Sequence, residues 1–123
     1  MEEIPEKYRS DRGIIRETVM QLNRDINMDG MEVILSGNEQ RAFVELKEQL
    51  IPIIDKLQKG ERSFFNSLLY RIDINEKDYR AMMQNDGNTY FSDKLAELII
   101  RREFQKVLTR HFFSDKITKN NKS

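Results

Sequence analysis

The sequence predicts an all-α protein, a compact bundle of four to five helices with polar termini that we expect to be mobile. Apolar residues recur at spacings of three and four over several long segments, the pattern of helices that bury one face. Asparagine and glycine stand between these segments, and both are typical of helix ends and turns. With 123 residues, one domain can bury about two-thirds of the surface of the unfolded chain, enough for a single core.

The composition excludes several classes of site. The chain has no cysteine, so disulfides and thiolate metal sites are excluded, and one histidine cannot form a zinc site built from several. No apolar run approaches the ~18 residues of a membrane span, and the acidic, polar start of the chain is unlike a signal peptide. We therefore expect a cytoplasmic protein that needs no metal or cofactor and does not engage a membrane.

The chain divides into one domain and two tails. Residues 1–12 are mostly charged and lack helical periodicity, which predicts a mobile tail. We expect a single helical domain over residues 13–113, whose first helix spans residues 14–27. Its apolar stripe is Ile14, Ile15, Val19, Leu22 and Ile26. Residues 31–35 lie between two glycines. The sequence is compatible with either a strand or an extended connector over these residues.

The next helix has the clearest pattern. Asn38 is a good N-cap residue, because its side-chain oxygen can accept from backbone N–H groups of the first turn. Gly60 marks the end of this helix, and Pro52 inside it predicts a kink. The apolar stripe consists of Ala42, Phe43, Leu46, Leu50, Ile53, Ile54 and Leu57.

Residues 64–74 form the densest apolar run near the middle of the chain, and we expect the central helix over residues 61–71. Arg71 and Asp73 lie inside this run, and an unpaired buried charge is too costly to keep. The last helix carries Glu103 in a comparably apolar setting. We therefore expect a structural ion pair of Arg71 with Glu103 or Asp73, which fixes the register of the central and last helices.

A short helix and a long one complete the domain. Asn75 is a second N-cap residue, and the short helix that it begins runs through Met83. The last helix is apolar on more than one face, with Ile100 and Phe104 on the second side. Exposed apolar surface usually marks an interface, so these two residues predict part of a homodimer contact. Residues 114–123 are polar, and we expect them to be disordered.

The end of the chain is basic, because residues 101–123 hold seven basic and two acidic side chains. A possible nucleic-acid contact consists of Arg101, Arg102, Lys106 and Arg110. The net charge of zero argues against strong phosphate attraction, and Glu97 can pair with Arg101 one turn away. A solvated helix face is therefore the preferred interpretation.

One segment resembles part of a calcium-binding loop. Asp25, Asn27, Asp29 and Gly30 match the first six positions of such a loop, with oxygen ligands at every second residue and a glycine turn. The twelfth position is Ser36, where a bidentate carboxylate is required. We therefore predict no calcium binding tighter than about millimolar.

Two short runs resemble a known group of proteins. Leu68-Leu69-Tyr70-Arg71-Ile72-Asp73 and Leu98-Ile99-Ile100-Arg101-Arg102-Glu103 are similar to runs in a family of small, uncharacterised bacterial helical proteins, over roughly residues 14–113. The resemblance implies one compact helical domain. That family has no known activity, so the resemblance implies no site residue.

The sequence contains no set of nucleophile and base that would predict catalysis. His111, near the end of the last helix, is expected to interact with the helix dipole. The favoured hypothesis is a small, non-catalytic interaction or oligomerisation module whose partner is another copy or another protein. Nucleic-acid binding through residues 101–123 is the alternative, and an enzyme comes third.

Overall fold

The computed structural model describes residues 4, 6–27, 31–60, 62–84 and 90–121. These residues form an all-α structure, as the sequence predicts, with no strand among them. The helices are α1 (Glu6–Arg9), α2 (Arg12–Ile26), the short 3-10 helix η1 (Glu39–Arg41), α3 (Ala42–Lys59), α4 (Arg62–Ile72), α5 (Glu76–Gln84) and α6 (Phe91–Asn121).

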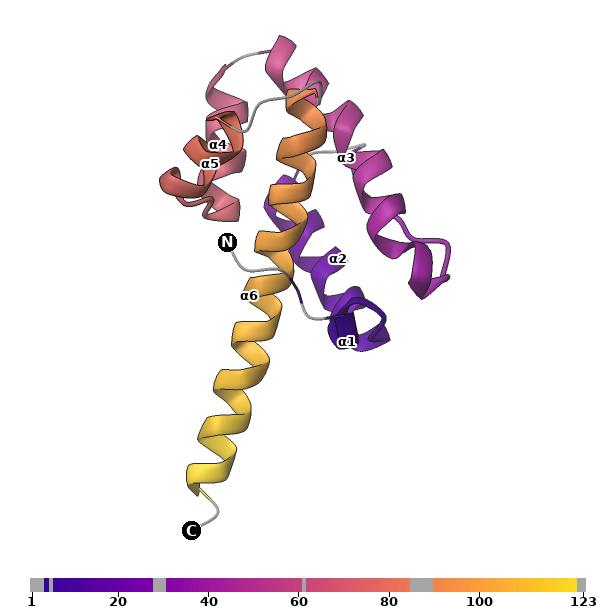
Figure 1. Ribbon diagram of the computed structural model, residues 1–123, viewed down its shortest axis with the longest axis vertical. Coiled ribbons are helices and arrows are strands. Elements are labelled where there is room, and N and C mark those ends of the chain that lie inside the picture. The colour runs from indigo at the N-terminus through magenta and orange to yellow at the C-terminus, as the bar shows by residue number, and fades with distance from the viewer. Residues whose placement is uncertain (1–3, 5, 28–30, 61, 85–89, 122–123) are drawn as a thin grey trace.

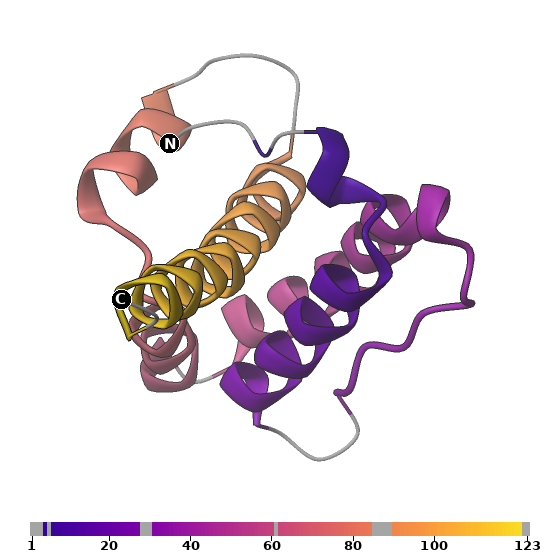
Figure 2. The same ribbon diagram turned by 90° about the horizontal axis from the view of Figure 1, so that it is seen from below.

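The last helix organises the bundle. α2, α3, α4 and α5 all contact α6, which lies in the middle of the view in Figure 1 and extends beyond the other helices at its C-terminal end. Figure 2 shows α2 and α3 on one side of α6 and α5 on the other. The fully buried apolar side chains come from α2, α3, α4 and α6, among them Leu22, Leu46, Leu50, Ile54, Leu68, Ile72, Leu95, Ile99 and Phe104.

The helix ends predicted from the sequence are present. Asn38 Oδ1 accepts from the backbone N–H of Gln40 at 3.1 Å, and it opens η1, which runs directly into α3. Asn75 Oδ1 accepts from the backbone N–H of Lys77 at 2.7 Å at the start of α5. Gly60 follows α3 and donates its N–H to carbonyls of the last turn. These caps define where the helices start and stop.

Residues 31–36 form an extended connector, which settles the choice left open by the sequence. The Asn23 side chain of α2 donates to the carbonyl of Val33 at 3.1 Å and accepts from its N–H at 2.8 Å. The Gln49 side chain of α3 makes the same pair of bonds to Ile34, at 2.7 and 2.8 Å. The two amides therefore satisfy the backbone groups that a neighbouring strand would otherwise satisfy.

Part of the predicted N-terminal tail is packed on the domain. Ile4 is buried, and Tyr8 of α1 is partly buried, with its ring edge-to-face against Phe112 of α6 at 6.1 Å. The prediction of a tail apart from the core is wrong for these residues, because two apolar side chains are too few to show a period.

At the other end, α6 continues as a helix to Asn121, since neither glycine nor proline interrupts it.

Candidate functional site

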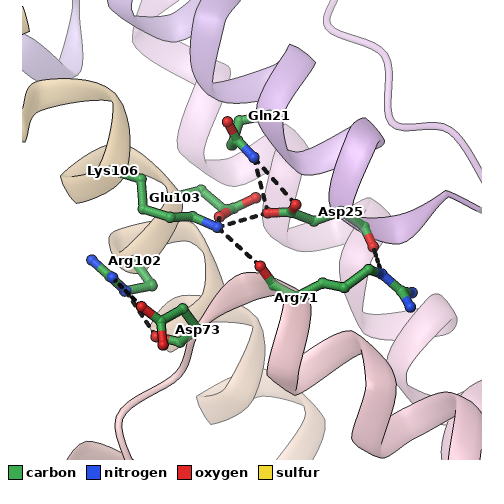
Figure 3. A network of polar contacts seen from close by, with 7 residues as sticks. All are labelled: Gln21, Asp25, Arg71, Asp73, Arg102, Glu103 and Lys106. Atoms are coloured by element: carbon green, nitrogen blue, oxygen red, sulfur yellow. Dashed lines mark hydrogen bonds and ion pairs between the residues drawn. The ribbon is translucent and has the colours of Figure 1, made fainter. Parts of the chain in front are cut away.

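The ion pair predicted for the central segment is wrong in its partners. Arg71 Nε donates to the backbone carbonyl of Asp25 at 2.6 Å (Figure 3). Arg71 Nη2 also donates to the backbone carbonyl of Ile26 at 3.3 Å. Carbonyls at the C-terminal end of a helix lack partners within the helix and carry partial negative charge. Arg71 therefore caps α2, and it pairs with neither Glu103 nor Asp73.

Asp73 pairs with a different arginine of α6. Arg102 Nη2 lies 2.9 Å from Asp73 Oδ2, and its Nε donates to the Asp73 carbonyl at 2.9 Å. Asp73 has a positive φ of 64° directly after α4. Arg102 thus holds the turn between α4 and α5 against α6.

Glu103 belongs to a buried cluster that joins α2 to α6. Lys106 Nζ lies 2.7 Å from Glu103 Oε1 and 2.8 Å from Asp25 Oδ2. Gln21 donates to both Asp25 carboxylate oxygens, at 3.2 and 3.3 Å (Figure 3). We call Gln21, Asp25, Glu103 and Lys106 the carboxylate cluster.

The two carboxylates of the cluster differ in acidity. Burial, reinforced by the neighbouring Asp25, raises the pKa of Glu103 to about 8. Burial also acts to raise the pKa of Asp25, but hydrogen bonds from Glu103, Lys106 and Gln21 outweigh it and lower that pKa. At neutral pH, a protonated Glu103 therefore lies beside an ion pair of Asp25 and Lys106.

Two carboxylates of unequal pKa are also a pattern of acid–base catalysts. Here the Glu103 side chain has an exposed fraction of 0%, and those of Asp25 and Lys106 have 10% and 19%. A substrate would have no access to Glu103 without separating α2 from α6. The cluster therefore has a structural role, and it fastens the two helices together.

The interface predicted for Ile100 and Phe104 is also wrong, because neither side chain is exposed. Ile100 and Phe104 are buried within the chain, with exposed fractions of 1% and 0%. The Phe104 ring stacks on Phe43 of α3, with ring centroids 4.8 Å apart. The second apolar face of α6 is covered because helices pack around this part of it.

The basic residues of α6 do not form a free stripe. Lys106 lies in the carboxylate cluster, Arg102 is paired with Asp73, and Arg101 also interacts with a neighbouring group. Arg110 is exposed, and within the described chain it forms no ion pair. Of the four predicted nucleic-acid contacts, only Arg110 is without an interaction in the described part of the protein.

An apolar hollow of about 450 Å³ lies between α2, the connector and the start of α3. Arg12 and Arg16 contribute to its lining, and Arg12 pairs with Glu39 of η1. Its apolar lining consists of Ile15, Val19, Met20, Leu35 and Ala42. We call this site the apolar hollow.

A second hollow, of about 330 Å³, lies between α2 and α6. Arg24 of α2 and Arg110 of α6 are both exposed, and neither forms an ion pair with any described residue. His111 Nε2 lies 2.5 Å from Glu17 Oε2 in the same lining. We call this site, lined by Glu17, Met20, Gln21, Arg24, Arg110 and His111, the basic hollow.

The two hollows adjoin at Met20, which lines both and is 55% exposed. Arg12, Arg16, Met20 and Arg24 follow one another at intervals of four residues, so they form one line along α2. This spacing is visible in the sequence. The buried stripe of α2 does not reveal it, because these four residues lie on the exposed face of the helix.

The calcium-loop residues are used differently in the structure. The Asp25 carboxylate faces Lys106, and Asn27 ends α2 with a left-handed φ of 43°. Asp29 and Gly30 lie outside the described residues. Among the residues described, no three histidine or acidic side chains are grouped so that they could hold a metal ion.

No helix in the described part of the chain has the length and apolar character needed to cross a membrane. Comparison of the chain with protein-family models, curated proteins and solved structures gave no match. The resemblance to small bacterial helical proteins therefore stays a prediction.

Proposed function

We propose that the protein is a small, non-catalytic binding module that recognises an acidic, amphipathic segment of another protein on the exposed face of α2. The observation that carries this proposal is the meeting of the apolar and basic hollows at Met20. One ligand can place apolar side chains in the first hollow and negative groups at the second. This surface replaces the predicted contact through Ile100 and Phe104, which are buried.

The chemistry of the two hollows fits an amphipathic ligand. A helical segment that binds a groove presents apolar anchors at intervals of three and four residues. Met20, at the boundary, is a flexible side chain of the kind that adapts to different apolar partners. Arg16 and Arg24 stand one turn on either side of Met20, so they can meet carboxylates that flank such an anchor.

A protein ligand is favoured over a nucleic acid. The floor of the apolar hollow includes Ile15, Val19 and Leu35, which offer nothing to a phosphate backbone. Arg102 and Lys106 are already neutralised by carboxylates, so the predicted basic stripe on α6 is reduced. An enzyme is not favoured either, because the carboxylate cluster is closed to substrates.

Affinity capture from a lysate of the source organism tests the proposal with three forms of the protein. Met20→Glu places a negative charge between the two hollows and should repel an acidic ligand. Tyr70→Glu is the matched control, because Tyr70 is an 87% exposed apolar side chain on α4. We expect one set of proteins to be retained by the wild type and by Tyr70→Glu but lost with Met20→Glu.

Several outcomes would overturn the proposal. Equal retention by Met20→Glu and the wild type would remove the α2 surface from consideration, as would the absence of any retained protein. Nuclease-sensitive retention would favour the nucleic-acid alternative. A sedimentation mass that rises with concentration, and that Met20→Glu lowers, would identify the occupant as a second copy of this chain.

A further inference from the structure

We propose that the basic hollow binds a phosphate group, carried by a phosphorylated side chain of the partner segment, between Arg24 and Arg110. This inference rests on the proposed function and adds the chemical class of the group that the hollow accepts. Arginine guanidinium groups form paired, charge-assisted hydrogen bonds with phosphate oxygens. Two of them from different helices line this one hollow, and no described carboxylate pairs with either.

The carboxylate cluster preorganises the hollow. Gln21 belongs to both, because it lines the hollow and donates to the Asp25 carboxylate. Lys106, which pairs with Asp25, lies one helical turn before Arg110. The backbone positions of Arg24 and Arg110 are therefore fixed relative to each other before a ligand binds, which lowers the entropic cost of binding.

Glu17 and His111 set the charge at the edge of the hollow. Their side chains pair with each other, with Nε2 and Oε2 2.5 Å apart. An incoming phosphate is repelled by the Glu17 carboxylate and competes with it for the imidazole. Removing the Glu17 charge should therefore strengthen phosphate binding, whereas removing either arginine should weaken it.

The first test is a titration with inorganic phosphate that is monitored by NMR. Sodium chloride is exchanged for phosphate so that the ionic strength stays constant. We expect saturable shifts confined to the segments 17–24 and 106–112. Arg24→Ala and Arg110→Ala should each weaken binding about tenfold, the effect of one charge-assisted hydrogen bond. Glu17→Gln should strengthen it several-fold.

Arg62→Ala is the matched control, because Arg62 on α4 is exposed and has no partner among the described residues. It should leave phosphate binding unchanged. An equal loss with Arg62→Ala and Arg110→Ala would mean that only net charge matters and would overturn the inference. The absence of saturable shifts, or unchanged binding by Glu17→Gln, would also overturn it.

The second test identifies the carrier of the phosphate. An amphipathic acidic peptide with one phosphoserine should bind at least tenfold more tightly than the same peptide with serine, and Arg24→Ala should remove the difference. If both peptides bind equally and Met20→Glu abolishes both, the proposed function stands and the phosphate inference fails. Tighter binding to vesicles of phosphatidylcholine and phosphatidic acid than to the phosphopeptide would assign the hollow to a lipid and overturn it too.

Discussion

Lys106 of α6 forms an ion pair with Asp25 of α2, with Nζ 2.8 Å from Oδ2. The two residues lie 81 positions apart in the sequence. The same ammonium group lies 2.7 Å from Glu103, which is fully buried. One cation therefore serves two carboxylates, and this arrangement is electrically balanced only while one carboxylate carries a proton. Burial keeps that proton on Glu103, whose pKa is raised to about 8.

Stability should fall as the pH rises from about 4.5 to about 8, the ordinary and the folded pKa of Glu103. The folded state holds this proton more tightly than the unfolded chain does, so the stabilisation is complete below the unfolded pKa and is lost as the pH rises through the folded value. The expected slope is about 1.4 kcal/mol per pH unit for one proton. Asp25 acts in the opposite sense, because its lowered pKa adds stability that is lost only in more acidic solution.

Glu103→Gln isolates this effect, since glutamine resembles the protonated acid in shape and does not titrate. Urea unfolding between pH 4.5 and 9 should show that the free energy of unfolding of the variant is nearly level where that of the wild type declines. The variant should be the more stable protein above pH 8. If the two proteins show parallel pH curves, Glu103 does not hold the proton.

Lys106 and Arg71 should contribute very differently to stability. Lys106→Met leaves the buried Asp25 carboxylate without its cation and should cost about 3–5 kcal/mol. Arg71 is exposed and donates to two backbone carbonyls, so Arg71→Ala should cost only about 1 kcal/mol. Denaturant unfolding of both variants at pH 6 measures the difference.

A double-mutant cycle gives the control for this comparison. Asp25→Asn combined with Lys106→Met should recover part of the loss, because no unpaired charge then remains buried. Arg71→Ala and Glu103→Gln should show a weaker coupling than Asp25 and Lys106, since Arg71 contacts only the backbone carbonyl of Asp25 and makes no contact with Glu103. A large coupling energy between Arg71 and Glu103 would instead support the ion pair that the sequence predicts and that the structure does not contain.

Apolar contacts in this protein can be predicted from the sequence, whereas the partners of its charged side chains cannot. The stripe that contains Leu46, Leu50 and Ile54 predicts both a helix and its buried face, because a fixed period determines which side chains point together. Partner choice among charged residues has no such period. Arg71 and Glu103 both have apolar neighbours in the sequence. Their partners depend on which helix end lies against α4 and α6, and that is a property of the tertiary structure.

The same limit explains the error over Ile100 and Phe104. A second apolar face on α6 indicates that this face is buried. The sequence does not say whether it packs against another chain or against other helices of the same chain. The exposed line through Arg16, Met20 and Arg24 could have been recognised from its spacing of four. The adjoining hollows could not, because their walls come from Leu35 and Arg110, on different elements.

The connector provides a last prediction, because its two amide contacts are alike in geometry and differ in burial. Asn23 bonds both backbone groups of Val33, which is 2% exposed, whereas Gln49 bonds those of Ile34, which is 72% exposed. Asn23→Ala leaves buried groups unsatisfied and should cost about 1–3 kcal/mol, and Gln49→Ala should cost less than about 1 kcal/mol because water can replace its bonds. Urea unfolding measures both costs, and hydrogen exchange at the Val33 amide should accelerate only in Asn23→Ala. Equal costs, with unchanged exchange at Val33, would mean that the connector is held by its apolar side chains alone.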